Sequence, residues 1–91
     1  MRLDPDGALV LDGEIDSFSA GLLAERLHVD PTITTLDLAG ISFIDSSGLR
    51  VLVAANQGAD GTSGIRLRSP SSAVQRLLEI SGLTGHLDIS A

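Results

Sequence analysis

Apolar positions along the chain fall into short runs that turn-forming residues separate. The run Ala8–Leu11 is apolar throughout and Asp12–Gly13 follows it, so we predict a strand that stops at this pair. A second strand is predicted over Thr34–Leu38, whose leucines would share one face with the Asp opposite. Ile65–Arg68 alternates apolar and charged residues, which predicts a half-exposed strand near a sheet edge, and Leu83–Ile89 is expected to hold a last short strand.

Three further segments carry apolar residues at helical spacing. Pro31 should end the first of them, because the residue before a proline avoids the helical region. Glycine is favoured just beyond the end of a helix, and it is found there after the other two. The predicted helices run from a cap at Ser17 or Ser19 to about His28, from the junction after Ile44 to near Gly58, and from a start within Ser69–Ser72 to Gly82.

Strand and helix segments therefore alternate along the whole chain, with connections short enough for parallel crossovers. The 91 residues suffice for one hydrophobic core, and no internal repeat or low-complexity segment divides them. We predict a single α/β domain over residues 1–91, with helices packed against a sheet.

Composition narrows the classes of function. The net charge of −6 at pH 7 counts against nucleic acid and anionic membranes as partners. The only aromatic residues are two Phe, so the core should be aliphatic and stacking platforms for bases are lacking. The chain has no Cys, no apolar stretch long enough for a membrane span and no secretion signal at its amino terminus. These features predict a soluble cytoplasmic protein.

The segment Asp45-Ser46-Ser47-Gly48 stands between a strand-like run and a helix-like run. Hydroxyls and a carboxylate would then lie at the start of a helix, where backbone N–H groups and the helix dipole favour an anion such as a phosphate on serine. Gly48 would leave room for the approaching group. A well-capped helix without further function explains the same four residues, because Ser and Asp are preferred caps.

A second candidate segment is Gly13-Glu14-Ile15-Asp16-Ser17, which follows the first predicted strand. In an open α/β sheet its loop would lie at the same edge as Ser46, where functional loops gather. A plain turn followed by an acidic first helical turn is the structural alternative.

Catalysis by this chain is not expected. A serine nucleophile needs a neighbouring base, and the histidines, His28 and His86, lie in or beside the ends of predicted elements. The chain has no Gly-x-Ser-x-Gly motif, and two His without Cys are a poor zinc set. We therefore predict that the chain has no enzymatic activity and binds no cofactor or metal. A small hydrolase that uses Ser46 and a histidine is kept as an alternative function.

Three segments together make the chain resemble the STAS domain family, and more narrowly the bacterial anti-sigma factor antagonists. Gly13–Asp16 is similar to the Gly-Glu-Leu-Asp of that family, and Leu36–Leu49 resembles its phosphorylation segment. Ser72–Leu83 resembles its penultimate helix with the Ser/Thr-Gly-Leu ending. The order and spacing agree over about residues 8–89.

The resemblance implies a small STAS-type fold, a four- to five-stranded mixed sheet with helices packed against it, and no enzymatic activity. It implies that Ser46 is a phosphoacceptor, that the kinase is the partner, an ATP-bound anti-sigma factor, and that a PP2C-type phosphatase removes the phosphate. The unphosphorylated form would bind the anti-sigma factor and release a sigma factor. The implied partner-binding residues are Gly13, Glu14, Asp16, Ser17, Asp45, Ser46, Ser47, Gly48 and Arg50.

The chain departs from the family pattern at Arg50, in its amino-terminal strand, in the short connection from His28 to Thr34 and in a terminal helix that is cut back. Arg50 stands where the family often has a second Gly, which places bulk and charge beside the acceptor and bears on which partner can bind. The amino-terminal strand is cut short or absent, with only Met1–Asp6 remaining, so a homodimer that covers a sheet edge is one expectation. The alternative function is a non-switching STAS-type scaffold subunit of a transporter-associated or stressosome-like assembly, in which Ser46 is structural only.

Overall fold

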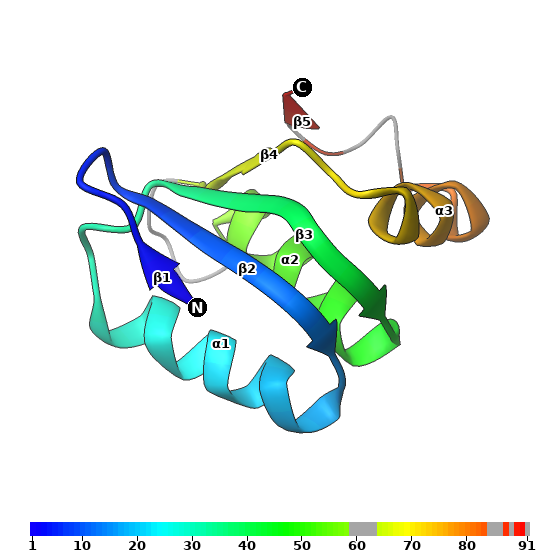
Figure 1. Ribbon diagram of the computed structural model, residues 1–91, viewed down its shortest axis with the longest axis horizontal. Helices are drawn as coiled ribbons and strands as arrows, with labels where there is room; N and C mark the ends of the chain where they lie inside the picture. Colours follow the sequence, from blue (N-terminus) through cyan, green and yellow to red (C-terminus); the bar gives the residue numbers. More distant parts are fainter. Residues whose placement is uncertain (59–63, 84–86, 88, 91) are drawn as a thin grey trace.

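The computed structural model describes residues 1–58, 64–83, 87 and 89–90. In these residues the elements follow the predicted alternation of strand and helix (Figure 1). They are β1 (Arg2–Leu3), β2 (Ala8–Ile15), α1 (Ser17–Val29), β3 (Thr35–Ile44), α2 (Ser46–Gln57), β4 (Arg66–Arg68), α3 (Ser72–Ser81) and β5 (Ile89–Ser90).

Within the described residues the strands form one five-stranded sheet in the order β1-β2-β3-β4-β5. The short strand β1 is antiparallel to β2, and every other pair is parallel. The predicted α/β fold with a four- to five-stranded mixed sheet is therefore confirmed. The amino-terminal strand is cut short but present, and β4 lies one strand in from the edge because β5 pairs with it.

Two strand ends were predicted wrongly. β2 does not stop at Asp12–Gly13 but continues to Ile15, because Gly13 takes a positive φ of 75° and the register against β3 shifts on both sides of it. A bulge therefore accommodates residues that resemble a turn. β3 likewise continues beyond Leu38 to Ile44, and its carboxyl-terminal half pairs with the extended part of β2.

The helix ends follow the predicted chemistry with one correction. Asp16, rather than Ser17 or Ser19, caps α1, and Ser19 completes a capping box by accepting a hydrogen bond from the Asp16 N–H. The residues that close α2 and α3, Gly58 and Gly82, both adopt the left-handed conformation expected just after a helix.

The core is aliphatic, as predicted. It lies where β2, β3 and β4 meet the helices, and the figure shows α1 and α2 side by side on one face of the sheet with α3 beside β3 (Figure 1). The largest fully buried side chains are Leu9, Leu11, Leu23, Leu36, Leu38, Leu52, Leu67, Leu78 and Val74. Both aromatic residues lie outside this core: Phe18 is 76% exposed and Phe43 is 48% exposed.

An ion pair joins two neighbouring strands away from this core. Nη2 of Arg68 donates a hydrogen bond of 3.0 Å to Oδ2 of Asp37, which links β4 to β3. The second amino group of Arg68 lies 3.7 Å from the carboxylate of Asp6, in the turn between β1 and β2. One arginine thus holds three segments of the sheet together.

In the part of the chain that the structure describes, no helix combines the length and the apolar character needed to cross a bilayer.

Candidate functional site

The two candidate segments meet at one edge of the sheet. β2 ends at Ile15 and its parallel neighbour β3 ends at Ile44, so the residues after each strand emerge side by side (Figure 1). The N–H of Asp45 donates a hydrogen bond of 3.2 Å to the carbonyl oxygen of Ile15 and ties the two strand ends together. The predicted juxtaposition of Gly13–Ser17 with the start of the Ser46 helix is therefore present.

Asp45 caps α2. Its Oδ1 accepts hydrogen bonds from the N–H groups of Ser47, at 2.9 Å, and Gly48, at 3.1 Å, and its backbone oxygen accepts the N–H of Leu49. The capping prediction for this segment is thus confirmed. Because the Asp45 carboxylate already occupies these two donors, a phosphate here could not rely on them.

Ser46 is the first residue of α2 and is exposed. Its hydroxyl makes no hydrogen bond to any residue that the structure describes. Ser47 is half-buried, and it supports the first turn through its backbone N–H. Of the two serines, Ser46 is therefore the one whose hydroxyl a second protein can reach without rearrangement.

Gly48 is buried, and it does not lie open to an approaching group. A Cβ atom at this position would lie 2.7 Å from Cγ2 of Ile15 and 2.9 Å from Cγ1 of Ile44. Gly48 thus lets α2 pack directly against the ends of β2 and β3, and this close approach positions Ser46. Gly48 was expected to lie in the partner-binding surface; instead it is buried and supports that surface from below.

The first candidate segment contributes exposed groups from β2 and the start of α1. Gly13 and Glu14 lie in β2 rather than in a loop, and Ser17 is the first residue of α1. Hydrogen bonds from the backbone N–H and then the hydroxyl of Ser19 lower the pKa of Asp16, so this carboxylate stays charged to a lower pH than an ordinary Asp. Acidic groups of Asp16 and Asp45 therefore stand at the tied strand ends.

Arg50 is exposed and lies one turn after Ser46 on α2. It forms no ion pair with any described residue. The edge thus carries carboxylates at the helix starts, and α2 places the cation of Arg50 beyond the exposed hydroxyl.

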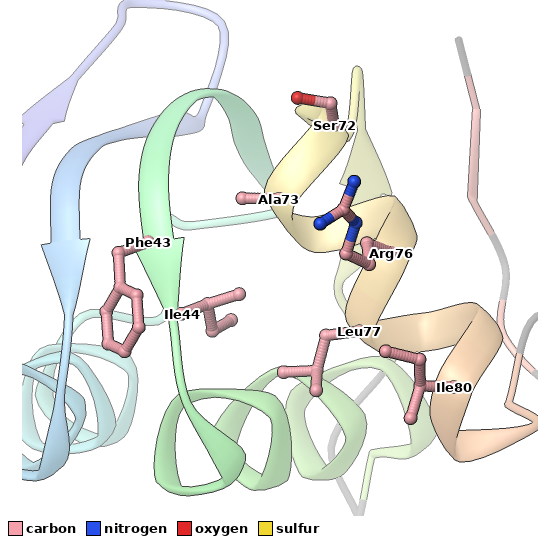
Figure 2. A pocket seen from close by; sticks show the side chains of 7 residues that line it. All are labelled: Phe43, Ile44, Ser72, Ala73, Arg76, Leu77 and Ile80. Carbon is pink, nitrogen blue, oxygen red and sulfur yellow. The ribbon is translucent and has the colours of Figure 1, made fainter.

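The sequence reasoning missed an apolar hollow beside this edge. Figure 2 shows Ile44 from β3 and Leu77 from α3 projecting into the space between the two elements. Phe43, Arg76 and the 76% exposed Ile80 complete the lining, together with Ser72 and Ala73. An apolar residue at position 80 lies off the buried stripe of α3 formed by Val74 and Leu78, and that mismatch is the signal the sequence carried.

His28 lies in the last turn of α1, at the end of the helix away from Asp16 and the tied strand ends. It therefore cannot reach Ser46 as a general base. His86, the other histidine considered for the hydrolase alternative, lies outside the described residues.

Comparisons with known proteins agree with this fold. The family model described as "Mlab, STAS domain" matches residues 2–89. The chain is 34% identical over 82 residues to an anti-sigma-B factor antagonist of Listeria monocytogenes, an alignment that covers 85% of this chain and 72% of the relative. It is 35% identical over 83 residues to the anti-sigma-B factor antagonist of Bacillus subtilis, covering 87% of this chain and 76% of the relative.

A crystal structure from Thermotoga maritima, provisionally described as an anti-sigma factor antagonist, superimposes with a TM-score of 0.72 at 22% identity, over 99% of this chain and 83% of that one. It shares the fold of this chain. The sheet order, the segments that meet at its edge and the match over residues 2–89 lead to one conclusion: the chain belongs to the STAS domain family.

Proposed function

We propose that this chain is an anti-sigma factor antagonist of the cytoplasm. In its unphosphorylated form it binds a cognate anti-sigma factor with serine kinase activity and so releases a sigma factor. Phosphorylation of Ser46 ends this binding, and a PP2C-type phosphatase restores it. The observation that carries the proposal is the exposed hydroxyl of Ser46 at the tied strand ends, in a chain about a third identical to relatives named anti-sigma-B factor antagonists.

In this proposal the chain is a substrate and not an enzyme. The Ser46 oxygen attacks the γ-phosphorus of ATP held by the partner, the new O–P bond forms as the bond to ADP breaks, and a base of the partner takes the hydroxyl proton. The contact surface comprises Gly13, Glu14, Asp16 and Ser17 with Asp45, Ser46, Ser47 and Arg50, while Gly48 supports it from below.

The physical basis of the switch is the charge at this edge. A phosphate on Ser46 adds about −1.5 to −2 charges next to the carboxylates of Asp16 and Asp45. The N–H groups of Ser47 and Gly48 are occupied by Asp45, so the added charge stays at the surface. A penalty of about 3 kcal/mol at a desolvated interface weakens binding more than a hundredfold, which releases the partner without unfolding the chain.

The test is phosphorylation by a purified cognate anti-sigma factor with ATP, followed by intact-mass measurement. We expect one phosphate on the parent and on Ser47→Ala, the matched control, and none on Ser46→Ala. Titration calorimetry with the same partner should give a dissociation constant more than about a hundredfold higher for the phosphorylated chain. Stoichiometric phosphorylation of Ser46→Ala would refute the assignment of the site.

The scaffold alternative predicts a different outcome. A chain that serves as a subunit of a transporter-associated assembly would copurify with membrane transport proteins, and would neither bind an anti-sigma factor nor accept phosphate at Ser46.

A further inference from the structure

Arg50 shares one exposed stripe of α2 with Ser46. Within α2, all of which the structure describes, the exposed residues are Ser46, Arg50, Ala54 and Gln57. Their spacing of four, four and three residues places them along a single face, opposite the buried Leu49 and Leu52. The side chains of Ser46 and Arg50 are therefore direct neighbours on the helix surface.

Arg50 also lacks an acidic partner in the described part of the chain. Three arginines there are paired: Arg2 with Asp4, Arg26 with Asp30, and Arg68 with Asp6 and Asp37; Arg50, Arg66 and Arg76 form no ion pair with a described residue. No residue of α2 is acidic, so the i−4 neighbour that would ordinarily pair with Arg50 is instead the neutral hydroxyl of Ser46. Adding a phosphate to that hydroxyl would supply the missing anion.

We propose that Arg50 is the internal partner of the phosphate on Ser46, an inference that rests on the proposed function of Ser46 as a phosphoacceptor. An anion four residues before a cation is the favourable order of a helical ion pair. The guanidinium group matches the geometry of phosphate with two parallel N–H donors, which a lysine cannot offer. Because the carboxylate of Asp45 occupies the N–H groups of Ser47 and Gly48, Arg50 is the charged group on α2 that remains to bind the phosphate.

This pairing changes what the switch does at the surface. Before modification, the guanidinium of Arg50 projects from the docking face and can meet an acidic group of the partner. After modification, it folds along α2 onto the phosphate and is withdrawn from the partner. Phosphorylation therefore removes an attractive cation at the same time as it adds a repulsive anion.

The test uses the full chain with phosphoserine inserted at position 46 during translation, so that no kinase is needed. Phosphorus NMR then follows the second ionisation of the phosphate as pH is varied. Pairing with Arg50 favours the dianion, so Arg50→Gln should raise the midpoint by about 0.2 to 0.4 pH unit relative to the parent. In 1 M NaCl, where screening is strong, this difference should largely disappear.

Arg66→Gln is the matched control. Arg66 is also exposed, forms no ion pair with a described residue, and pairs in register with Thr35 at the start of β3, the end of the sheet away from Ser46. The carboxylates of Glu14, Asp16 and Asp45 at the tied strand ends are the same in every variant, so they cancel in the comparison. Arg50→Lys should give an intermediate midpoint, because it keeps the charge and loses the two-donor geometry.

Equal midpoints for the parent, Arg50→Gln and Arg66→Gln would overturn the pairing and leave the proposed function intact. A shifted midpoint in Arg50→Gln, together with no phosphorylation of Ser46 by any anti-sigma factor, would uphold the pairing chemistry and refute the proposed function. Far-UV circular dichroism of each variant establishes that the fold is retained.

Discussion

Gly48 lies against Ile15 so closely that a Cβ atom on the glycine would be 2.7 Å from Cγ2 and 3.2 Å from the carbonyl oxygen of Ile15. The same carbonyl oxygen accepts the N–H of Asp45. The start of α2 is therefore seated on the end of β2 at both its first turn and its cap. The position of Ser46 depends on this contact, because Ser46 lies between the two residues that make it.

We expect Gly48→Ala to destabilise the protein by about 1–3 kcal/mol, since the added methyl group must displace Ile15 or Ile44. The matched control is Gly21→Ala in α1, where nothing lies within 4 Å of the added Cβ. That change should stabilise the protein by about 0.5–1 kcal/mol, because alanine is the better helix former. Urea unfolding at pH 7 measures both, and a Gly48→Ala midpoint at or above that of the parent would contradict the packing argument.

Removing the cap of α2 should weaken the fold without removing a core contact. Asp45→Ala loses the acceptor of two N–H groups and is expected to lower the free energy of unfolding by about 1 kcal/mol. Asp45→Asn should retain most of the parent's free energy of unfolding, since the amide oxygen can accept the same hydrogen bonds. Asp12→Ala, an exposed carboxylate in β2, serves as the control and should change stability by less than about 0.5 kcal/mol.

The Asp37–Arg68 pair predicts how stability depends on pH. The pKa of Asp37 is lowered by the hydrogen bond from the N–H of Ala39 and by the guanidinium of Arg68, against the opposing effect of burial. Because the pKa of Asp37 is lower in the folded state, its ionised form stabilises the fold. This stabilisation is fully present above the pKa of the unfolded state and is lost as the pH falls through the pKa of the folded state.

Asp37→Asn should therefore destabilise the protein at pH 7 by about 1 kcal/mol, and the difference from the parent should vanish in acid. Arg68→Gln removes the counterion from the other side and should raise the pKa of Asp37 towards its ordinary range. Thermal unfolding of both variants between pH 2 and pH 7 makes the comparison. A difference that persists unchanged at the acid end would exclude the ion pair as its source.

The aliphatic core predicts an unusual order of sensitivities. Leu36→Ala, near the start of β3 and fully buried, should lower the free energy of unfolding by about 2–5 kcal/mol. Phe43→Ala removes a larger side chain but one that is 48% exposed, so its effect on stability should be below about 1 kcal/mol. Parallel guanidinium unfolding tests this order, and a reversal would mean that Phe43 packs in solution.

The sequence alone was sufficient to predict the alternation of strands and helices, the aliphatic core and the sheet edge at which the two candidate segments meet. Those follow from local apolar spacing and from the rule that parallel strands end at one edge. It was insufficient to predict that β2 continues to Ile15, because a bulge at Gly13 overrides the local preference of Asp12–Gly13 for a turn.

The roles of individual site residues also depended on tertiary contacts. Nothing within the motif indicates that Gly48 is buried against Ile15, since Ile15 is distant in the sequence. The hollow lined by Phe43 and Ile80 requires β3 and α3 to be placed side by side, which no local pattern encodes. The stripe that joins Ser46 to Arg50, by contrast, follows from helical spacing once the helix start is known.

The surface location of both aromatic side chains has a consequence for spectroscopy. The chain has no Trp and no Tyr, so it is almost silent in the fluorescence range used for proteins. Phe18 follows Ser17 in the first turn of α1, beside the edge assigned to partner contact, and most of its side chain is already in solvent. Replacing it, Phe18→Trp, would therefore introduce a lone indole whose emission reports the arrival and departure of a second protein against no background from the fold.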